Sequence, residues 1–247
     1  MRVSLSFVSI ALAATVAGCS PASEVGTPQP APAPASKSAA AEPRPELPSF
    51  EGRTLARTMS YLGADWLTRP ERDAEENTTL LHEQLGLEPG QVACDVGAGN
   101  GYHSLRMAAA VGPSGEVIAS DLQPEMLALL RDRAEAAGVT NIRTVEARVG
   151  DPALPKATCD LILLVDVYHE FADPEGALAA MRAALSEGGR IALVEYREED
   201  PAVPIKPLHK MSKAQILREY LPRGFVLAAE YDGLPWQHLM VFAADSG

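Results

Sequence analysis

Basic residues are scarce in this chain of 247 residues, which has 21 Lys and Arg against 33 Asp and Glu and a formal net charge of -12. No block of Lys or Arg occurs, so the electrostatic footprint required for binding phosphate backbones is missing. The composition therefore argues against nucleic acid as a partner. Hydrophobic residues make up 47% of the chain, which excludes disorder for most of it and is enough for one sizeable α/β core.

The apolar run at the amino terminus, residues 3–16, is too short to span a bilayer as a stable anchor. Because Met1-Arg2 precedes it, the run predicts an export signal. It ends in Val16-Ala17-Gly18-Cys19, which resembles the box of bacterial lipoproteins, where the signal is cut before a cysteine that is then acylated. We therefore expect residues 1–18 to be a lipoprotein signal peptide and Cys19 to carry lipid. An ordinary secretory signal with an incidental cysteine is the alternative.

Eight of the 20 prolines fall between Pro21 and Pro48, among Ala, Ser and Glu, a composition that cannot bury enough apolar area to fold. Residues 19–49 are therefore predicted to be a linker, and residues 50–247 a single domain. Such a protein would be anchored in the cell envelope on the periplasmic face. Ser20, rather than an aspartate, follows the cysteine, which favours the outer membrane over the inner one.

Only two cysteines remain in the predicted domain, Cys94 and Cys159. An exported domain could pair them. On neighbouring parallel strands, however, they would lie about five residues apart along the strand axis, beyond the ~7 Å limit between the Cα atoms of a disulfide. We therefore expect two buried free thiols.

From residue 50 onward, short apolar runs alternate with helical stretches, which is typical of βαβ units around a parallel sheet. Thr68 and Glu71 form a capping box at the start of the second helix. Strands are expected at 92–96, 116–121, 142–147, 159–165, 190–195, 225–231 and 237–243, and helices at 53–61, 68–85, 102–111, 124–137, 174–185 and 212–220. The segment between the third and fourth strands is too short for a crossover helix, and the five-residue connection before the last strand predicts an antiparallel pair.

A glycine-rich loop directly follows the first of these strands and opens a helix, the setting in which such a loop binds an anionic group. A dinucleotide-binding G-x-G-x-x-G would need glycine where Tyr102 stands, which disfavours a nucleotide-dependent oxidoreductase. Instead, Gly97, Gly99 and Gly101, preceded by Asp95, resemble motif I of the class I S-adenosylmethionine-dependent methyltransferases.

Asp121 closes the second strand 20 residues beyond Gly101, where a carboxylate can accept from both ribose hydroxyls. The resemblance extends from about residue 50 to 243, with 160–171 similar to the family's fourth-strand motif and Gly188-Gly189-Arg190 to the turn before its fifth strand. Within the superfamily the chain is similar to the ubiquinone/menaquinone-biosynthesis type. The resemblance implies a Rossmann-like sheet of seven mostly parallel strands with an antiparallel last strand, helices on both faces, and a short amino-terminal helical cap.

The same resemblance implies S-adenosylmethionine as the cofactor. It places this cofactor against residues at the carboxyl ends of the strands: Asp95, Gly97, Gly99, Gly101, Asp121 and Asp166. The shortened segment after the third strand departs from the family pattern, so the adenine contacts are in doubt there. Asp151 is our candidate for them.

Methyl transfer is an in-line displacement at a sulfonium, for which alignment and exclusion of water supply much of the catalysis. His169 follows the fourth strand, and an imidazole with a reference pKa of about 6.5 is suited to removing a proton from an acceptor. Alternatively, it only caps a helix or lines the cleft. Glu195, at the end of the fifth strand, could face the acceptor as a second catalytic candidate or pair with Lys206 or Arg197.

Candidates for the acceptor pocket are Tyr168, His209 on the long loop after the fifth strand, and Trp66 on the helical cap, where simple packing is the alternative. Trp236-Gln237-His238 is expected to be structural. Five histidines without evident tight pairing and no C-x-x-C motif predict no metal site.

Two hypotheses follow from these patterns. The first is a lipid-anchored, exported methyltransferase acting on a small molecule that the sequence does not identify, because substrate sites in such folds lie on variable caps and loops. The second is a cofactor-binding or interaction module that has lost turnover. It is motivated by the absence of a twin arginine in the signal, since the chain would then cross the membrane unfolded, away from the cytosol where S-adenosylmethionine is made.

Overall fold

A computed structural model describes residues 47–245 of the chain. The expected signal peptide, Cys19 and residues 19–46 of the expected linker lie outside the described residues. Among the described residues, no helix combines the length and the apolar character needed to cross a bilayer.

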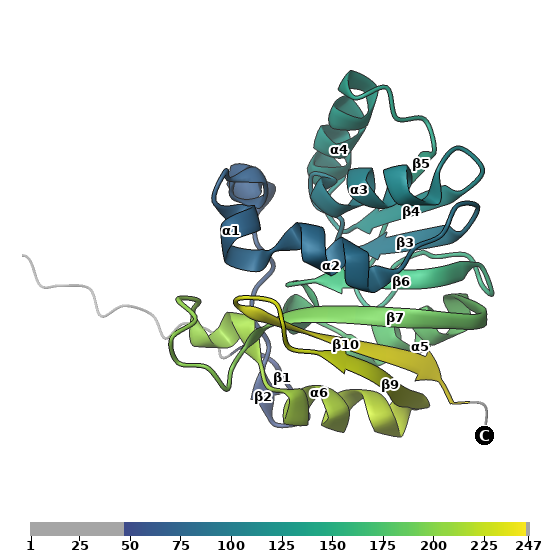
Figure 1. The fold of residues 1–247 in the computed structure, drawn as a ribbon. Coiled ribbons are helices and arrows are strands. Elements are labelled where there is room, and N and C mark those ends of the chain that lie inside the picture. Colours follow the sequence, from purple (N-terminus) through teal and green to yellow (C-terminus); the bar gives the residue numbers. More distant parts are fainter. Residues whose placement is uncertain (1–46, 246–247) are drawn as a thin grey trace, which may run out of the picture. The chain divides into compact units, whose positions relative to one another are not determined.

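A mixed β-sheet forms the centre of the fold (Figure 1). Its strands lie in the order β5 (Ile142–Glu146), β4 (Glu116–Asp121), β3 (Val92–Val96), β6 (Cys159–Val165), β7 (Leu185–Arg197), β10 (Gln237–Ala244) and β9 (Phe225–Tyr231). The first five strands are parallel, β10 is antiparallel to both of its neighbours, and the short β8 (Lys210–Met211) pairs with β7. This arrangement confirms the Rossmann-like sheet and its antiparallel last strand.

Helices cover both faces of the sheet, as expected. They are α1 (Arg72–Glu76), α2 (Thr78–Leu85), α3 (Tyr102–Val111), α4 (Pro124–Ala136), α5 (Pro174–Ala184) and α6 (Lys213–Tyr220). Alternate residues of β6 point to opposite faces, so Leu161 and Leu163 pack with α2 and α3, whereas Ile162 and Leu164 pack with α5 and α6. Burial on both faces explains why the sequence of this strand is a continuous apolar run.

The expected helix at 53–61 is wrong. Arg53–Thr54 instead forms strand β2, which pairs antiparallel with β1 (Ser49–Phe50). Glu51 and Gly52 make the turn with φ angles of 48° and 88°, a conformation that no helix contains. The Arg53 guanidinium then reaches the Glu219 carboxylate of α6 at 2.7 Å. The two residues are 166 positions apart, so local sequence patterns do not predict this contact.

The expected helix at 68–85 is also divided, into α1 and α2, and a 3-10 helix η1 (Tyr61–Thr68) precedes it. The break falls at Asn77, which has a φ of 49° and whose side chain accepts from the Leu80 amide to cap α2. The predicted capping box does not form, because the Thr68 hydroxyl donates to the Asp65 carbonyl instead.

Cys94 and Cys159 form a disulfide bond, which corrects the expectation of two free thiols. Their Cα atoms are 5.8 Å apart, within the range that a disulfide bridges. Cys94 is aligned with Ile162, so the two cysteines are offset by three residues along the strands instead of five. Cys159 also lies outside the stretch of β6 that pairs with β3, which begins at Leu161, and the pairing of β6 with β7 shifts register between the same two residues.

Candidate active site

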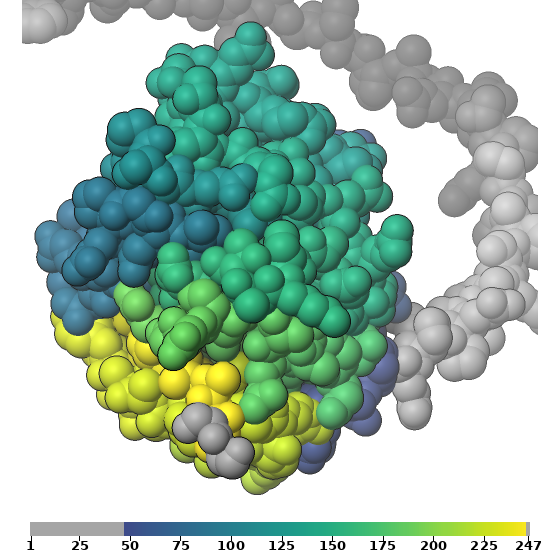
Figure 2. Space-filling model, turned by 90° about the vertical axis from the view of Figure 1, so that its right-hand side faces the viewer, coloured from purple at the N-terminus to yellow at the C-terminus, as the bar shows by residue number. Residues whose placement is uncertain are grey.

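A cavity of about 690 Å³ lies at the carboxyl ends of the parallel strands. Open α/β sheets bind their ligands at this end, and the volume is in the range of small-molecule sites. The glycine loop and the end of β4 form one wall, and the segment after β6 and the loop at 204–209 form another. Figure 2 shows the molecule from the right-hand side of Figure 1, where the segments pack closely without a comparable hollow.

The glycine loop is held close to the cavity by its backbone. Gly97, Gly99 and Gly101 all have positive φ, and the amides of Gly97 and Ala98 donate to the Ser120 carbonyl at the end of β4. A Cβ at Gly97 would collide with the Val167 side chain, so a larger residue would displace the loop. Gly97 and Gly99 line the cavity, whereas Gly101 packs against α4 and begins α3.

Asp121 stands at the end of β4, on the cavity wall. One carboxylate oxygen accepts from the Gly99 amide at 2.9 Å and the other from the Gln123 amide at 2.8 Å. Each oxygen keeps a further lone pair, so the carboxylate is oriented and can still accept from a ligand. Burial raises the pKa of Asp121 despite these hydrogen bonds.

The other three predicted cofactor aspartates occupy different settings. Asp95 lies beneath the loop rather than on the cavity wall, accepts from the Ser104 hydroxyl at 2.5 Å, and has a pKa that burial raises to about 6. Asp151 is exposed at the cavity rim. Asp166 lines the cavity, and one of its oxygens accepts from the Gln237 side chain at 2.6 Å.

The second oxygen of Asp166, Oδ1, is buried without a hydrogen-bond partner among the described residues. A buried acceptor of this kind costs free energy unless a ligand supplies a donor. Burial, together with the nearby charges of Glu76 and Glu195, raises the pKa of this carboxyl group. The glycine cradle, Asp121 and this unsatisfied oxygen therefore fit a ligand that has hydroxyl and ammonium donors, as S-adenosylmethionine has.

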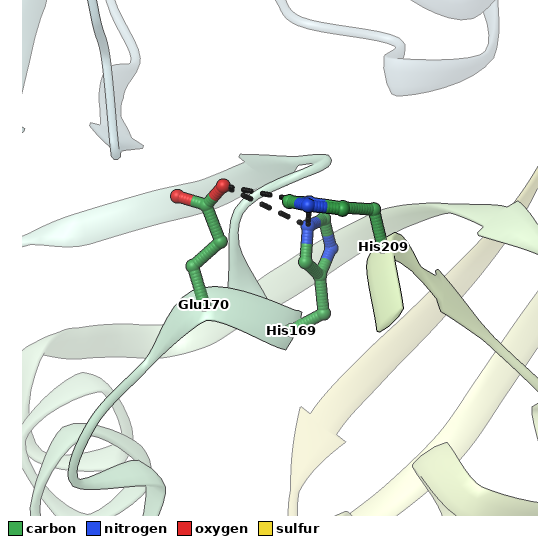
Figure 3. A group of neighbouring side chains, drawn as sticks. All are labelled: His169, Glu170 and His209. Atoms are coloured by element: carbon green, nitrogen blue, oxygen red, sulfur yellow. Dashed lines mark hydrogen bonds and ion pairs between the residues drawn. The ribbon is translucent and has the colours of Figure 1, made fainter. Parts of the chain in front are cut away.

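His169 belongs to the 3-10 helix η2 (Tyr168–Glu170) and is only 2% exposed (Figure 3). Its Nδ1 lies 2.6 Å from Oε2 of Glu195, and its Nε2 lies 3.0 Å from Nδ1 of His209, in the 3-10 helix η3 (Pro207–His209). Oε1 of Glu170 lies 3.9 Å from the same Nε2 and 3.7 Å from His209 Nδ1. His169, Glu170 and His209 all line the cavity.

The electrostatics of this cluster are dominated by burial and by its carboxylates. Burial lowers the pKa of His169, but the charge and hydrogen bond of Glu195 outweigh it, and the pKa is raised overall. Burial raises the pKa of Glu170 to about 7. The pKa of His209 is lowered by burial and by the neighbouring His169 and Lys206.

Three expectations about these residues need correction. Glu195 is fully buried and does not line the cavity, so it does not face the acceptor. It pairs with His169 instead of Lys206 or Arg197, and the Arg197 guanidinium donates to backbone carbonyls of the 232–235 turn. Four of the five histidines are tightly paired after all, since His82 and His103 also meet, at 3.1 Å. These pairs join positions that are 40 and 21 residues apart in the sequence.

The third correction concerns Tyr168, which is fully buried in the core and does not line the cavity. Its hydroxyl donates to Glu219 at 2.7 Å, so the side chain anchors η2 to α6 in the core. Trp66 does line the cavity, with the Arg69 guanidinium 3.7 Å above its ring. Gln237, which the sequence predicts to be structural, also holds Asp166 in place. Glu170 adjoins His169 in the sequence, but no motif marks it as a site residue.

Comparisons with known proteins bear on the family and the fold. Residues 93–189 match a family model described as a methyltransferase domain. The chain is 31% identical over 115 residues to the ubiquinone/menaquinone biosynthesis C-methyltransferase UbiE of Ectopseudomonas mendocina, an alignment that covers 46% of this chain and 45% of that protein. The chain thus spans about half the length of the curated relatives it matches.

Solved structures extend the likeness in fold. A SAM dependent methyltransferase from Aquifex aeolicus aligns with a TM-score of 0.70 and 19% identity, covering 75% of this chain and 98% of that one. The [4+2]-cyclase SpnF aligns with a TM-score of 0.59 and 15% identity over 69% and 80% of the two chains. The cyclase shows that this fold supports more than one reaction. Taken together, these findings place a match to a methyltransferase domain at residues 93–189, within a fold that the chain shares with S-adenosylmethionine-dependent methyltransferases.

Proposed function

We propose that this protein transfers a methyl group from S-adenosylmethionine to a small-molecule acceptor, and that it does so as an exported protein anchored to the cell envelope by lipid. The observation that carries the proposal is the single cavity shared by two sets of residues. The glycine loop and Asp121 form the cofactor side, and the cluster around His169 forms the acceptor side.

In this proposal the backbone of Gly97 and Gly99 allows close approach of the cofactor, and Asp121 accepts from its ribose hydroxyls. Asp166 Oδ1 accepts from a further donor of the same ligand. When bound, the cofactor supplies a methyl group on a positively charged sulfur. The remaining walls hold the acceptor in line and keep water out, while His169 presents its Nε2 to the acceptor side.

The cofactor assignment predicts that Asp121→Ala weakens S-adenosylmethionine binding at least tenfold. The substitution removes charge-assisted hydrogen bonds to two hydroxyls, each worth about 1.5–3 kcal/mol. Isothermal titration calorimetry on the full-length protein measures the change. Asp132→Ala is the matched control, because Asp132 is an exposed aspartate of α4 that does not line the cavity. Wild-type affinity in a folded Asp121→Ala protein would contradict the assignment.

Export and anchoring are supported by the signal, the box ending at Cys19 and the proline-rich segment after it. The Cys94–Cys159 disulfide adds support, because disulfides form and persist in oxidising compartments such as the periplasm and are rare in the cytosol.

Cys19→Ala is expected to abolish incorporation of a labelled fatty acid and to release the protein from the membrane fraction. Acylation needs the thiol of this residue, and stable anchoring needs more than one acyl chain or a second signal. Metabolic labelling followed by membrane fractionation provides the measurement, with Ser20→Ala as the neighbouring control. An unlabelled, soluble wild-type protein would refute the anchor without touching the methyltransferase assignment.

The activity itself is tested with methyl-tritiated S-adenosylmethionine and lipid, quinone and polar extracts of the source cells. We expect the label to move into one fraction, with release of S-adenosylhomocysteine. The alternative, a module that binds the cofactor without turnover, is motivated by the export signal without a twin arginine, because the chain would then leave the cytosol where S-adenosylmethionine is made. Cofactor binding without transfer to any fraction would favour that alternative.

A further inference from the structure

We propose that His169, Glu170 and His209 bind one divalent transition-metal ion of the zinc class at the acceptor side of the cavity. This inference goes beyond methyl transfer, since neither the glycine loop nor the cofactor enters it. Figure 3 shows the three side chains converging from η2 and η3. Within residues 47–245, they are the group of His, Cys, Asp and Glu side chains whose ligand atoms gather closely enough to hold a metal ion.

The distances between the three ligand atoms allow one ion to reach all three. His169 Nε2 and His209 Nδ1 are 3.0 Å apart, and Glu170 Oε1 lies 3.9 Å and 3.7 Å from them. A point equidistant from the three atoms lies about 2.1 Å from each, which matches zinc–nitrogen and zinc–oxygen bond lengths.

The neighbours of the three ligands leave the required lone pairs available. Glu195 occupies Nδ1 of His169 at 2.6 Å, so the other ring nitrogen, Nε2, can face the ion as a neutral donor. A carboxylate behind a metal-binding histidine is the usual supporting contact in zinc sites. In Glu170, Oε2 accepts from the Met59 amide at 3.2 Å, which leaves Oε1 toward the histidines.

The donor set and its exposure indicate which ion would bind and how. Two imidazoles and one carboxylate suit zinc and similar transition metals better than magnesium or calcium, which prefer oxygen ligands. The side chains are 2%, 10% and 32% exposed for His169, Glu170 and His209, so protein covers one side of the site and the cavity the other. Three protein ligands with an open position are typical of metals that act on a substrate.

The second histidine pair provides a natural contrast. His82 and His103 lie at a similar distance, 3.1 Å, but no carboxylate of residues 47–245 completes the pair. The Arg72 guanidinium also lies 3.1 Å from Nε2 of His103, and its positive charge opposes a cation. The chain therefore offers a matched control for its own site.

All three ligands line the cavity, so a bound ion would lie beside the space that the proposed function gives to the acceptor. If that function holds, the acceptor carries an oxygen, such as a hydroxyl or carboxylate, that can join the ion. His169 would then activate the acceptor through the metal instead of accepting its proton directly. This last step rests on the proposed function, whereas metal binding itself does not.

The test uses the full-length protein, stripped with a chelator and dialysed against Zn²⁺. Elemental analysis should find one equivalent of zinc, and Co²⁺ in its place should give the visible absorption of a four- or five-coordinate site. His209→Ala and Glu170→Gln should lose the bound ion, and Glu195→Gln should weaken binding about 10- to 100-fold. The control variant His82→Ala should retain a full equivalent and the wild-type cobalt spectrum.

Two results would overturn the site. One is a folded wild-type protein that holds no zinc above the level of the His209→Ala variant. The other is a folded double variant, His209→Ala with Glu170→Gln, that still binds a full equivalent. Circular dichroism checks the fold of each variant, and calorimetry with S-adenosylmethionine is run in parallel. Zinc bound without cofactor affinity would sink the proposed function and leave the metal site standing.

Discussion

His169→Ala is expected to lower the rate of methyl transfer by about 10²–10⁴-fold while S-adenosylmethionine affinity stays nearly unchanged. The ring lines the cavity and is held by Glu195, and in the proposed function it faces the acceptor while other residues bind the cofactor. Loss of a group that acts on the acceptor is felt in the transition state, so rate and cofactor binding separate. The measurement is release of S-adenosylhomocysteine under saturating acceptor, beside a calorimetric titration of the cofactor.

His82→Ala is the control for this experiment, because His82 also meets a second histidine but does not line the cavity. Wild-type turnover in His169→Ala would make His169 a wall residue and leave alignment alone to carry the reaction. Chelation separates the two possible roles of the ring. A wild-type rate that falls to the variant's level without metal points to ligation, and a rate that chelation leaves unchanged points to direct proton transfer.

Replacing both Cys94 and Cys159 by alanine should lower the free energy of unfolding by about 4 kcal/mol, as expected for removing a cross-link between distant positions of a chain. The bond closes a loop between residues separated by 65 positions, and both cysteines are fully buried. Urea unfolding of the full-length protein, followed by circular dichroism, measures the difference. The double variant is used because a single replacement would leave a reactive thiol behind.

Wild-type protein unfolded and refolded in the presence of a reductant is the control, and it should match the double variant in stability. If the double variant unfolds at the same urea concentration as the oxidised wild type, the bond contributes nothing to the fold. Titration of free thiols in the denatured protein shows independently whether the bond is present.

The central strands could be predicted from the sequence, because a strand that is buried on both faces consists of consecutive apolar residues. The strands 92–96, 116–121 and 159–165 coincide with β3, β4 and β6. The amino-terminal segment could not be predicted in the same way. Its hairpin depends on Arg53 reaching Glu219, and the division of the second helix depends on one asparagine in a left-handed conformation.

The candidate site also has a part that local sequence patterns predict and a part that they do not. The glycine loop and Asp121 follow directly from local motifs, since their spacing along one βαβ unit places them together. The acceptor side depends on contacts between distant segments. His169 meets Glu195 and His209 across 26 and 40 residues, and each of these contacts requires the register of the sheet and the course of the loop after β7. No pattern in the sequence carries that information.

The Cys94–Cys159 bond links the two strands on which the two sides of the cavity are built. Strand β3 leads into the glycine loop, and strand β6 leads into the segment with His169. A covalent tie between adjacent strands resists sliding of one past the other, a motion that hydrogen bonds alone would oppose less firmly. The disulfide would thus help to fix the distance between donor and acceptor in an in-line displacement. Because the bond persists only in an oxidising environment, the geometry of the site would depend on the compartment in which the protein resides.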